Sequence, residues 1–473
     1  MPKDSLSLLP QGKSRSESRR MGSRRLAMTI LLLLCASISS YARQKSDETN
    51  AAKGVKDKYI VFFLTNTPYR QMDKSNRGKD ADIRYSYVKE LRHLFGPIKK
   101  DSRYKYAIGL VGPMLLTQSV AQMRDEVNAA FDVAEANDVP LYFQIDDCNN
   151  YTNSFGDSAT PKFYMNPEWC EWTAFPKDTE SWGGESNGRL AYFWFNWGHW
   201  THAEAFPCYQ SPGFRNFVVS QLQNGVLDPL VKRYNKLMAE GKEYLFAGMA
   251  IGWETHIPDY SLNDTILKVK PGNLPVDVVT GDTMKAWEAT EYGYHSLYLK
   301  SYTTYNRLAL DTVIHDYSEL LARTVHNAGI PKQKIFTHMV GFMSSDRNLH
   351  TTFSPPMWAA VNNYSIPGFT LSPVTCWYNL DTLVSDIRKA DSGQRYFACA
   401  EGYGRGVDSS FGQAYSYFKS MFDHGAVLLT VFGWGIEGNP ISGYSPFAVS
   451  HSSKSPFVRA AKEWMDSQHH GPK

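Results

Sequence analysis

A regular alternation of strand-like and helix-like segments is the feature that most constrains this chain. Eight short segments rich in β-branched and aromatic residues have the length and composition of strands. They are residues 59–66, 106–112, 141–147, 245–254, 334–342, 369–374, 395–401 and 426–434. Eight such segments separated by helix-length stretches predict parallel β/α units, and the number eight favours a closed (β/α)8 TIM barrel over an open doubly wound sheet.

The expected helices carry apolar residues at spacings of three and four. We expect them over residues 119–137, 214–237, 285–327, 380–389, 411–422 and 455–467. Ser119 is placed to cap the first of them. The remaining length falls in loops that follow strands, so residues 58–473 are predicted to form a single α/β barrel domain with a long aromatic-rich loop after the third strand.

The first 42 residues have the pattern of a signal peptide. An apolar run of about 13 residues follows Arg24 and Arg25, and small residues precede a predicted cleavage after Ala42. The run is shorter than the roughly 20 residues of a membrane-spanning helix. Met21 is an alternative start, and Leu34 before Cys35 argues against a lipoprotein anchor. We therefore expect a secreted or periplasmic protein with a polar leader over residues 43–57.

The net charge of the chain limits the classes of binding partner, and its cysteines limit the possible disulfides. Residues 1–42 contribute +5 to the formal net charge of +3, so the remainder carries about −2. This removes the electrostatic case for nucleic acid or an anionic membrane as a partner. Five cysteines follow the predicted signal peptide, an odd number that leaves at least one thiol; the disulfide pairing stays open. We expect a monomer.

Two apolar strand segments end in a glutamate. The fourth ends with Glu254 and the seventh with Glu401. Barrel enzymes place their chemistry at the carboxyl ends of the strands. Period-two alternation gives Glu254 a face of small residues (Gly248, Ala250, Gly252), which leaves room in the barrel mouth. The same alternation directs Asp146 inward and Asp147 toward the rim.

On these glutamates and an aromatic residue after the eighth strand, the chain resembles the glycoside hydrolases of clan A. The resemblance is topological and covers most of residues 58–473. It implies that Glu254 is the acid/base and Glu401 the nucleophile, with Trp434 as the platform under the sugar. It also implies that Tyr378 is the tyrosine that hydrogen bonds the nucleophile.

One position departs from the clan. The residue before the acid/base is usually an asparagine that binds the sugar's 2-hydroxyl group, and here it is Trp253. Either this contact comes from Asp146 or Asn66, or the fourth strand is out of register with the clan. The expected substrate-binding residues are therefore Asp146, Asp147, Asn66, Trp253, His256, Tyr378 and Trp434.

Two carboxyl groups at one site can hydrolyse a glycosidic bond, whatever family the protein resembles. Glycoside cleavage needs a protonated acid at the leaving oxygen and an ionised carboxylate near the anomeric carbon. Carboxyl groups about 5–5.5 Å apart give retention of configuration, and separations of about 6.5–9.5 Å give inversion. Glutamates that face each other across a small barrel favour the shorter separation, so we expect retention without a cofactor.

The loop after the third strand fits a carbohydrate ligand. Six of the 12 tryptophans lie between residues 169 and 200, and indole rings stack on the apolar faces of sugars. A small satellite core under the loop is an equally good interpretation of most of them. His199, His202 and Glu204 lack the helical context of a zinc site, so no metal is expected.

The sequence predicts a secreted enzyme that hydrolyses O-glycosidic bonds of an oligosaccharide or polysaccharide. Two alternatives stay open. One is a non-catalytic carbohydrate-binding barrel with the same aromatic loop. The other is a substrate-assisted hexosaminidase-type enzyme that uses Asp146 and Asp147 as its catalytic pair. We find no serine or histidine constellation of the kind that an esterase or a metal-dependent hydrolase needs.

Overall fold

The computed structural model describes residues 55–64, 83–147, 166–176, 190–196, 199–262, 272–278, 280–341, 351–371, 373–402, 404, 406–434 and 452–467. The chain divides into two units, Met1–Lys56 and Asp57–Lys473. All the elements below belong to the second unit. The predicted signal peptide and the polar leader up to residue 54 lie outside the described residues.

The second unit is built on one large sheet. Its strands run in the spatial order β7, β6, β3, β2, β1, β11, β10, β9, β8, and every pair in it is parallel. Their bounds are β1 (Lys58–Leu64), β2 (Tyr104–Met114), β3 (Leu141–Asp146), β6 (Phe246–Ile251), β7 (Ile335–Thr337), β8 (Met339–Val340), β9 (Gly368–Leu371), β10 (Phe397–Gly402) and β11 (Ala426–Trp434). A separate antiparallel pair, β4 (Phe195–Asn196) and β5 (His199–Trp200), lies in the aromatic-rich segment.

The sheet closes on itself through an interrupted strand. β7 pairs with β6 and β8 pairs with β9, so the two are halves of one strand broken at His338. Across the closing seam the Thr337 amide donates to the Ile366 carbonyl at 3.2 Å, and the Gly341 amide donates to the Thr370 carbonyl at 3.0 Å. Counting β7 and β8 as one strand leaves eight positions around the barrel. The prediction of a (β/α)8 barrel is confirmed.

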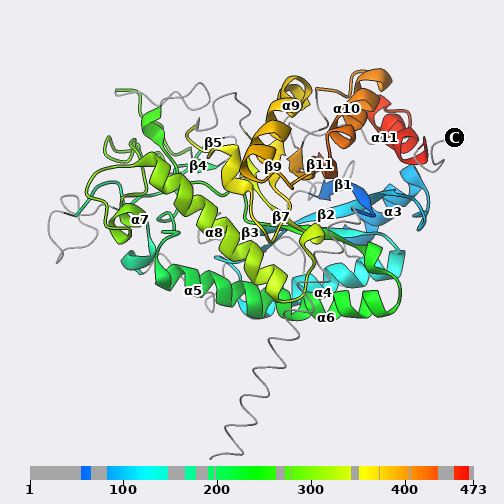
Figure 1. Ribbon diagram of the computed structural model, residues 1–473, viewed down its shortest axis with the longest axis horizontal. Coiled ribbons are helices and arrows are strands. Elements are labelled where there is room, and N and C mark those ends of the chain that lie inside the picture. Colours follow the sequence, from blue (N-terminus) through cyan, green and yellow to red (C-terminus); the bar gives the residue numbers. More distant parts are fainter. Residues whose placement is uncertain are drawn as a thin grey trace, which may run out of the picture. The chain divides into compact units, whose positions relative to one another are not determined.

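Helices cover the outside of the sheet. They are α3 (Ile83–Phe95), α4 (Val120–Asn137), α5 (Pro212–Gln221), α6 (Asp228–Ala239), α7 (Tyr294–Leu299), α8 (Arg307–Asn327), α9 (Pro373–Ala390), α10 (Phe411–Asp423) and α11 (Pro456–Ser467). A π-helical stretch, Leu222–Leu227, joins α5 to α6, and single 3-10 turns span Pro167–Trp169, Glu243–Leu245, Tyr260–Leu262, Lys332–Lys334 and Met357–Ala360. Figure 1 shows α4, α5 and α6 below the strands, α8 crossing in front of them and α9, α10 and α11 above. None of the described helices has the length and hydrophobicity of a membrane span.

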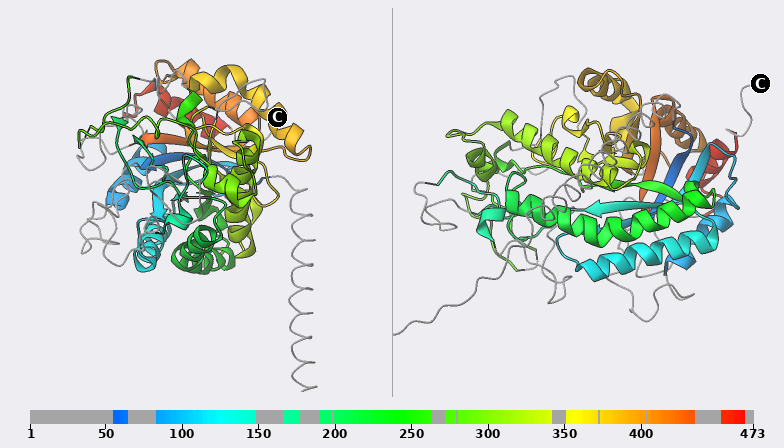
Figure 2. Two further views of the ribbon diagram at one scale, coloured as in Figure 1. Left: turned by 90° about the vertical axis from the view of Figure 1, so that its left-hand side faces the viewer. Right: turned by 60° about the horizontal axis from the view of Figure 1, so that its bottom comes forward.

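The helix predicted over residues 119–137 begins where its cap was expected. Ser119 accepts from the Gln122 amide, and the Gln122 side chain accepts from the Ser119 amide in return. α4 lies beside α6, as Figure 2 shows, and a 2.7 Å ion pair between Glu135 and Lys236 joins the two helices. The single helix predicted over residues 285–327 is instead two helices, α7 and α8.

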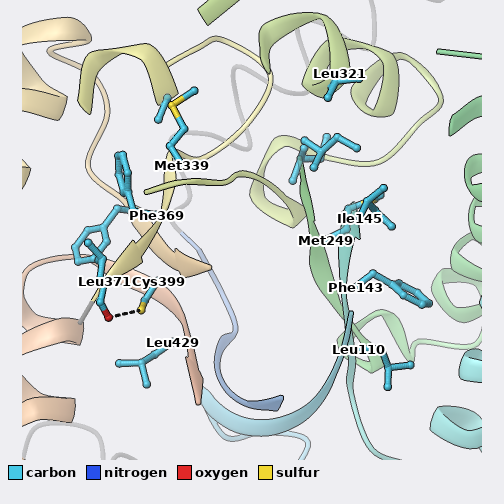
Figure 3. Packing of buried hydrophobic residues seen from close by; sticks show 14 of the residues in the cluster. Leu110, Phe143, Ile145, Met249, Leu321, Met339, Phe369, Leu371, Cys399 and Leu429 are labelled. Carbon is cyan, nitrogen blue, oxygen red and sulfur yellow. Dashed lines mark hydrogen bonds between the residues drawn. The ribbon is translucent and has the colours of Figure 1, made fainter. Parts of the chain in front are cut away.

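The strands present two different faces. Side chains such as Leu110 and Phe143 face the helices and join one continuous apolar core, as Figure 3 shows. The opposite face fills the barrel with aromatic rings. Tyr142 lies 5.8 Å from Phe63 and 6.3 Å from Phe336, ring centre to ring centre, although the three residues come from strands that are not neighbours. The interior of the barrel is therefore filled by aromatic side chains at the level of Tyr142. Two residues further toward the carboxyl end of β3, at Gln144, the interior becomes polar.

Candidate active site

Glu254 lies in a strained segment just beyond β6. Gly252 has a φ of +91° and Glu254 a φ of +51°, so two left-handed residues follow the strand within three positions. A left-handed conformation costs a residue with a Cβ about 1–2 kcal/mol. Two hydrogen bonds fix the segment: the Trp253 amide donates to Asp147 Oδ1 at 2.8 Å, and the Thr255 amide donates to the His338 carbonyl at 2.9 Å. Strain that is over-determined in this way is common at functional sites.

Glu401 reaches the same space through a β-bulge. Phe397 and Cys399 of β10 face the helices, and simple alternation would send Glu401 the same way. The pairing of β10 with β9 shifts between Cys399 and Glu401, so that Glu401 lies opposite Thr370. A bulge re-aims the side chain that follows it. The Glu401 carboxylate accepts a 3.2 Å hydrogen bond from Gln144 on β3, across the barrel.

The two glutamates meet at the barrel mouth together with His338. One oxygen of each carboxyl group and one ring nitrogen of His338 all lie within 4.8 Å of one another. Glu254 is 3% exposed and Glu401 is 5% exposed. Carboxyl groups so close and so well buried cannot both carry a full charge at low energetic cost.

Each carboxyl group has a distinct set of partners. The Thr370 hydroxyl donates to Glu254 Oε1 at 2.6 Å. The other oxygen, Oε2, is buried and accepts from no group among the described residues. Glu401 accepts from Gln144, whose amide nitrogen also lies 3.2 Å from His338 Nδ1. The site therefore leaves one carboxyl oxygen of Glu254 for a ligand.

Burial raises the pKa of both glutamates. It raises the pKa of Glu401 to about 7, against the lowering effect of hydrogen bonds from the Gln144 and Trp253 side chains. Burial and then the charge of Glu401 raise the pKa of Glu254 well above its ordinary value, although the bond from Thr370 lowers it. The charge of Glu401 is among the causes that raise the pKa of Glu254, so the two carboxyl groups titrate as a coupled pair, and the loss of one proton makes the other more tightly held.

The same cluster has the side chains of a possible metal site. Within the described residues it is the group of histidine and carboxylates close enough to share an ion. Both ring nitrogens of His338 are already in contact with protein, however: Nδ1 with Gln144 and Nε2 with Thr370 at 2.7 Å. A metal bond to His338 would have to break one of these contacts. The arrangement fits a hydrogen-bonded site better than a metal centre.

Asp147 lies under the Glu254 segment. It is completely buried, just beyond the carboxyl end of β3. Its Oδ1 accepts from the Trp253 amide, which turns the carboxylate into the chain rather than into solvent. Burial raises its pKa to about 6. This role leaves Asp147 poorly placed for the hexosaminidase-type alternative. Asp146 is also buried, at the end of β3.

Of the other predicted substrate-binding residues, Trp253 and His256 lie close to Glu254 in the chain. Trp253 is half-buried, and its side chain lies close enough to Glu401 to lower the pKa of that carboxyl group. His256 bonds through Nδ1 to the Glu254 carbonyl and packs among three phenylalanines, Phe193, Phe206 and Phe353. Asn66 lies outside the described residues, as does the side chain of Tyr378.

Trp434 is not a sugar platform in this structure. Its ring is completely buried and packs edge-on against Phe62 at 4.7 Å, within the core between sheet and helices. The pairing of β1 with β11 shifts between Phe62 and Leu64, which takes Trp434 out of phase with Phe432. Phe432 keeps the inward direction and lies 5.6 Å from Phe63.

At least part of the aromatic-rich loop packs into the apolar core. Trp172 is fully buried and stacks on His295 with ring centres 3.9 Å apart, and Trp194 is also buried. Trp169 and Trp200 are partly exposed. Trp182 and Trp197 lie outside the described residues. The packing interpretation therefore holds for Trp172 and Trp194.

Gly252 offers a test of how strictly the Glu254 segment is fixed. A Cβ at this position would collide with Thr255 Oγ1 and adopt an unfavourable φ. We expect Gly252→Ala to lower the free energy of unfolding by about 2–4 kcal/mol and to reduce any turnover. Gly241→Ala is the matched control, because Gly241 has a φ of +67° and no atom within 4 Å of the position that a Cβ would take. If urea unfolding gave the same loss of unfolding free energy for Gly252→Ala and Gly241→Ala, the collision with Thr255 would not contribute to the effect.

Sequence reasoning missed two residues of the site, His338 and Thr370. Both lie within predicted strands, where a polar residue among apolar ones is the available signal. His338 interrupts an apolar run, Ile335–Val340, and Thr370 follows Phe369. Gln144 shares the strand face of Asp146, which was expected to point inward, and it does face inward, but its two contacts could not be seen in the sequence.

No protein-family model matches the chain, and no curated protein matches it in sequence. Solved structures show a distant likeness. The endo-β-1,4-mannanase of Thermotoga petrophila is 9% identical, with a TM-score of 0.47 over 89% of this chain and 78% of that one. The endo-1,4-β-mannanase of Rhizomucor miehei is 9% identical, with a TM-score of 0.44 over 87% and 95%. The catalytic domain of the β-amylase of Paenibacillus polymyxa is 10% identical, with a TM-score of 0.42 over 88% and 100%. Likeness at this level assigns neither a family nor a substrate, so function must be argued from the residues.

Proposed function

We propose that this protein is a retaining glycoside hydrolase in which Glu254 is the acid/base and Glu401 the nucleophile. The observation that carries the proposal is the buried carboxyl pair at the carboxyl ends of the barrel strands, with one oxygen from each within 4.8 Å. This proximity agrees with the short separation of retaining enzymes, roughly 5–5.5 Å between carboxyl groups. Their hydrogen bonds assign the roles: Glu401 accepts from Gln144, as an ionised nucleophile would, and Glu254 Oε2 is buried without a donor among the described residues, as suits a protonated acid.

The reaction proceeds in two steps. Glu401 attacks the anomeric carbon while Glu254 gives its proton to the glycosidic oxygen, so the glycosidic bond breaks and a glycosyl ester of Glu401 forms. Glu254, now ionised, then takes a proton from water. The resulting hydroxyl oxygen bonds to the anomeric carbon and releases Glu401 as a carboxylate. Two displacements at one carbon restore its configuration, and Glu254 regains its proton.

We further propose that the protein is exported and acts on an oligosaccharide or polysaccharide. The signal-peptide pattern of residues 1–42 supports export. The partly exposed Trp169 and Trp200 and the half-buried Trp253 supply indole surface on which sugar rings can stack.

A hydrolysis screen with product analysis tests the proposal. Purified protein is incubated with nitrophenyl glycosides and with soluble polysaccharides, and the anomer formed first is followed by proton NMR. We expect turnover of at least one substrate with retention of configuration. Inversion would refute the nucleophile assignment. Binding of a polysaccharide without any hydrolysis would instead support the carbohydrate-binding barrel.

The pH dependence of turnover is a separate prediction. Activity requires Glu401 ionised and Glu254 protonated, so kcat/KM should rise as pH approaches about 7 and fall at higher pH. Gln144→Leu removes a hydrogen bond that lowers the pKa of Glu401. The acidic limb of this variant should therefore move to higher pH. A profile that is flat between pH 5 and pH 9 would contradict the assignment.

A further inference from the structure

A continuous series of hydrogen bonds joins Glu401 to Glu254 through three intervening side chains, those of Gln144, His338 and Thr370. Gln144 Nε2 lies 3.2 Å from Glu401 Oε2 and 3.2 Å from His338 Nδ1. His338 Nε2 lies 2.7 Å from the Thr370 hydroxyl, which lies 2.6 Å from Glu254 Oε1. The linking residues come from three different strand positions of the barrel and are buried.

The donors and acceptors available in each side chain indicate which atom donates in each of these hydrogen bonds. An ionised Glu401 needs a donor, so the Gln144 nitrogen must face it. The same nitrogen faces His338 Nδ1, which favours Nδ1 as the bare nitrogen and Nε2 as the carrier of the ring proton, and the Gly252 carbonyl is a competing acceptor for that proton. Burial lowers the pKa of His338 to about 3, which agrees with a neutral ring. Nε2 then donates to Thr370, and the only proton of the Thr370 hydroxyl is left for Glu254 Oε1.

We propose that His338 and Thr370 are positioning residues that keep the proton of Glu254 on Oε2, the oxygen that faces the leaving group. Oε1 receives a hydrogen bond from Thr370, and the carbonyl oxygen of a protonated carboxyl group is a better acceptor than its hydroxyl oxygen, so this bond favours the proton on Oε2. Oε2 has no partner among the described residues and is free to donate to a substrate oxygen. The charge of the nucleophile thus fixes the direction in which the acid delivers its proton. This inference rests on the proposed function for its catalytic consequence, but not for the direction of the chain.

The direction can be measured without substrate. Nitrogen-15 NMR of histidine-labelled full-length protein distinguishes a bare Nδ1 from a protonated one, and the signal missing from His338→Gln identifies residue 338. We expect the Nε2–H tautomer to persist across pH 6–8. A protonated Nδ1 would reverse the chain and overturn the proposal, whether or not the protein hydrolyses glycosides.

The catalytic consequence is measured with Thr370→Val, which keeps the shape of the side chain but lacks its hydroxyl. A misdirected acid matters most for substrates with poor leaving groups. We expect kcat/KM to fall about 10- to 100-fold for an alkyl or sugar leaving group and less than about threefold for dinitrophenolate, which needs no protonation. Thr370→Ser restores the donor and should stay near the wild type for both. An equal loss with both leaving groups would show a merely structural role and overturn the proposal. If the wild type hydrolyses no glycoside, the proposed function fails, and the tautomer alone then decides the direction of the chain.

Discussion

Glu401→Ala is expected to lower kcat by about four orders of magnitude or more, because within the described residues Glu401 is the one carboxylate that shares the cluster of Glu254 and His338. The loss should lie in turnover rather than in binding. The Gln144 amide would lose its acceptor, but the residues that contact the rest of a sugar chain remain. Hydrolysis rates together with calorimetric titration of a polysaccharide fragment separate the two effects.

The cavity left by Glu401→Ala allows a second readout. Azide that enters it can attack the anomeric carbon in place of the carboxylate, giving a glycosyl azide of inverted configuration. Glu171→Gln is the matched control, since Glu171 is a buried glutamate whose pKa burial also raises to about 7 but whose partners are Ser296 and Trp172. A comparable loss of kcat in the Glu171 variant would remove the case for Glu401.

Glu254→Gln is expected to act selectively, according to the substrate. Glutamine occupies nearly the same volume and still accepts from Thr370, but it has no proton to give. General acid catalysis contributes about 10²- to 10⁴-fold, so hydrolysis of unactivated glycosides should fall by that factor. With a dinitrophenyl glycoside the first step needs no acid. The second step lacks its base, so the glycosyl ester of Glu401 should accumulate.

Stopped-flow release of dinitrophenolate and intact-protein mass spectrometry measure this outcome. A burst of one equivalent, with a matching increase in protein mass, is the expected result. A uniform loss for all substrates without a burst would mean that Glu254 is not the acid/base.

The sequence predicts the barrel well because its information is local. Each strand and most helices appear as short periodic patterns, and the cap of α4 is visible in Ser119. The two glutamates are found for the same reason, since each closes an apolar segment. Parallel strands bring their carboxyl ends to one edge, which is enough to place Glu254 and Glu401 near each other.

Alternation fails where a strand is irregular. The bulge in β10 turns Glu401 inward against its period-two phase, and the shift between β1 and β11 turns Trp434 into the core. Such shifts arise from pairing with a neighbouring strand that is remote in sequence. For the same reason the contacts of Gln144, His338 and Thr370 could not be predicted, since each depends on the closed ring of strands.

Folding removes Glu254 and Glu401 from water, and this opposes folding whenever they are charged. Glu401 ionises near its ordinary 4.5 in the unfolded chain but at about 7 in the barrel. Between these pH values the unfolded chain has released a proton that the folded chain retains, so the free energy of unfolding falls as pH rises. The loss from this one group is on the order of 3 kcal/mol. This one group therefore favours the folded state most on the acidic side of the pH at which the enzyme works fastest, whereas the buried His256, His295 and His338, whose pKa values burial lowers, act in the opposite direction. A neutral glutamine at position 401 would strengthen the fold as it silences the chemistry, so selection for stability alone would erase the site.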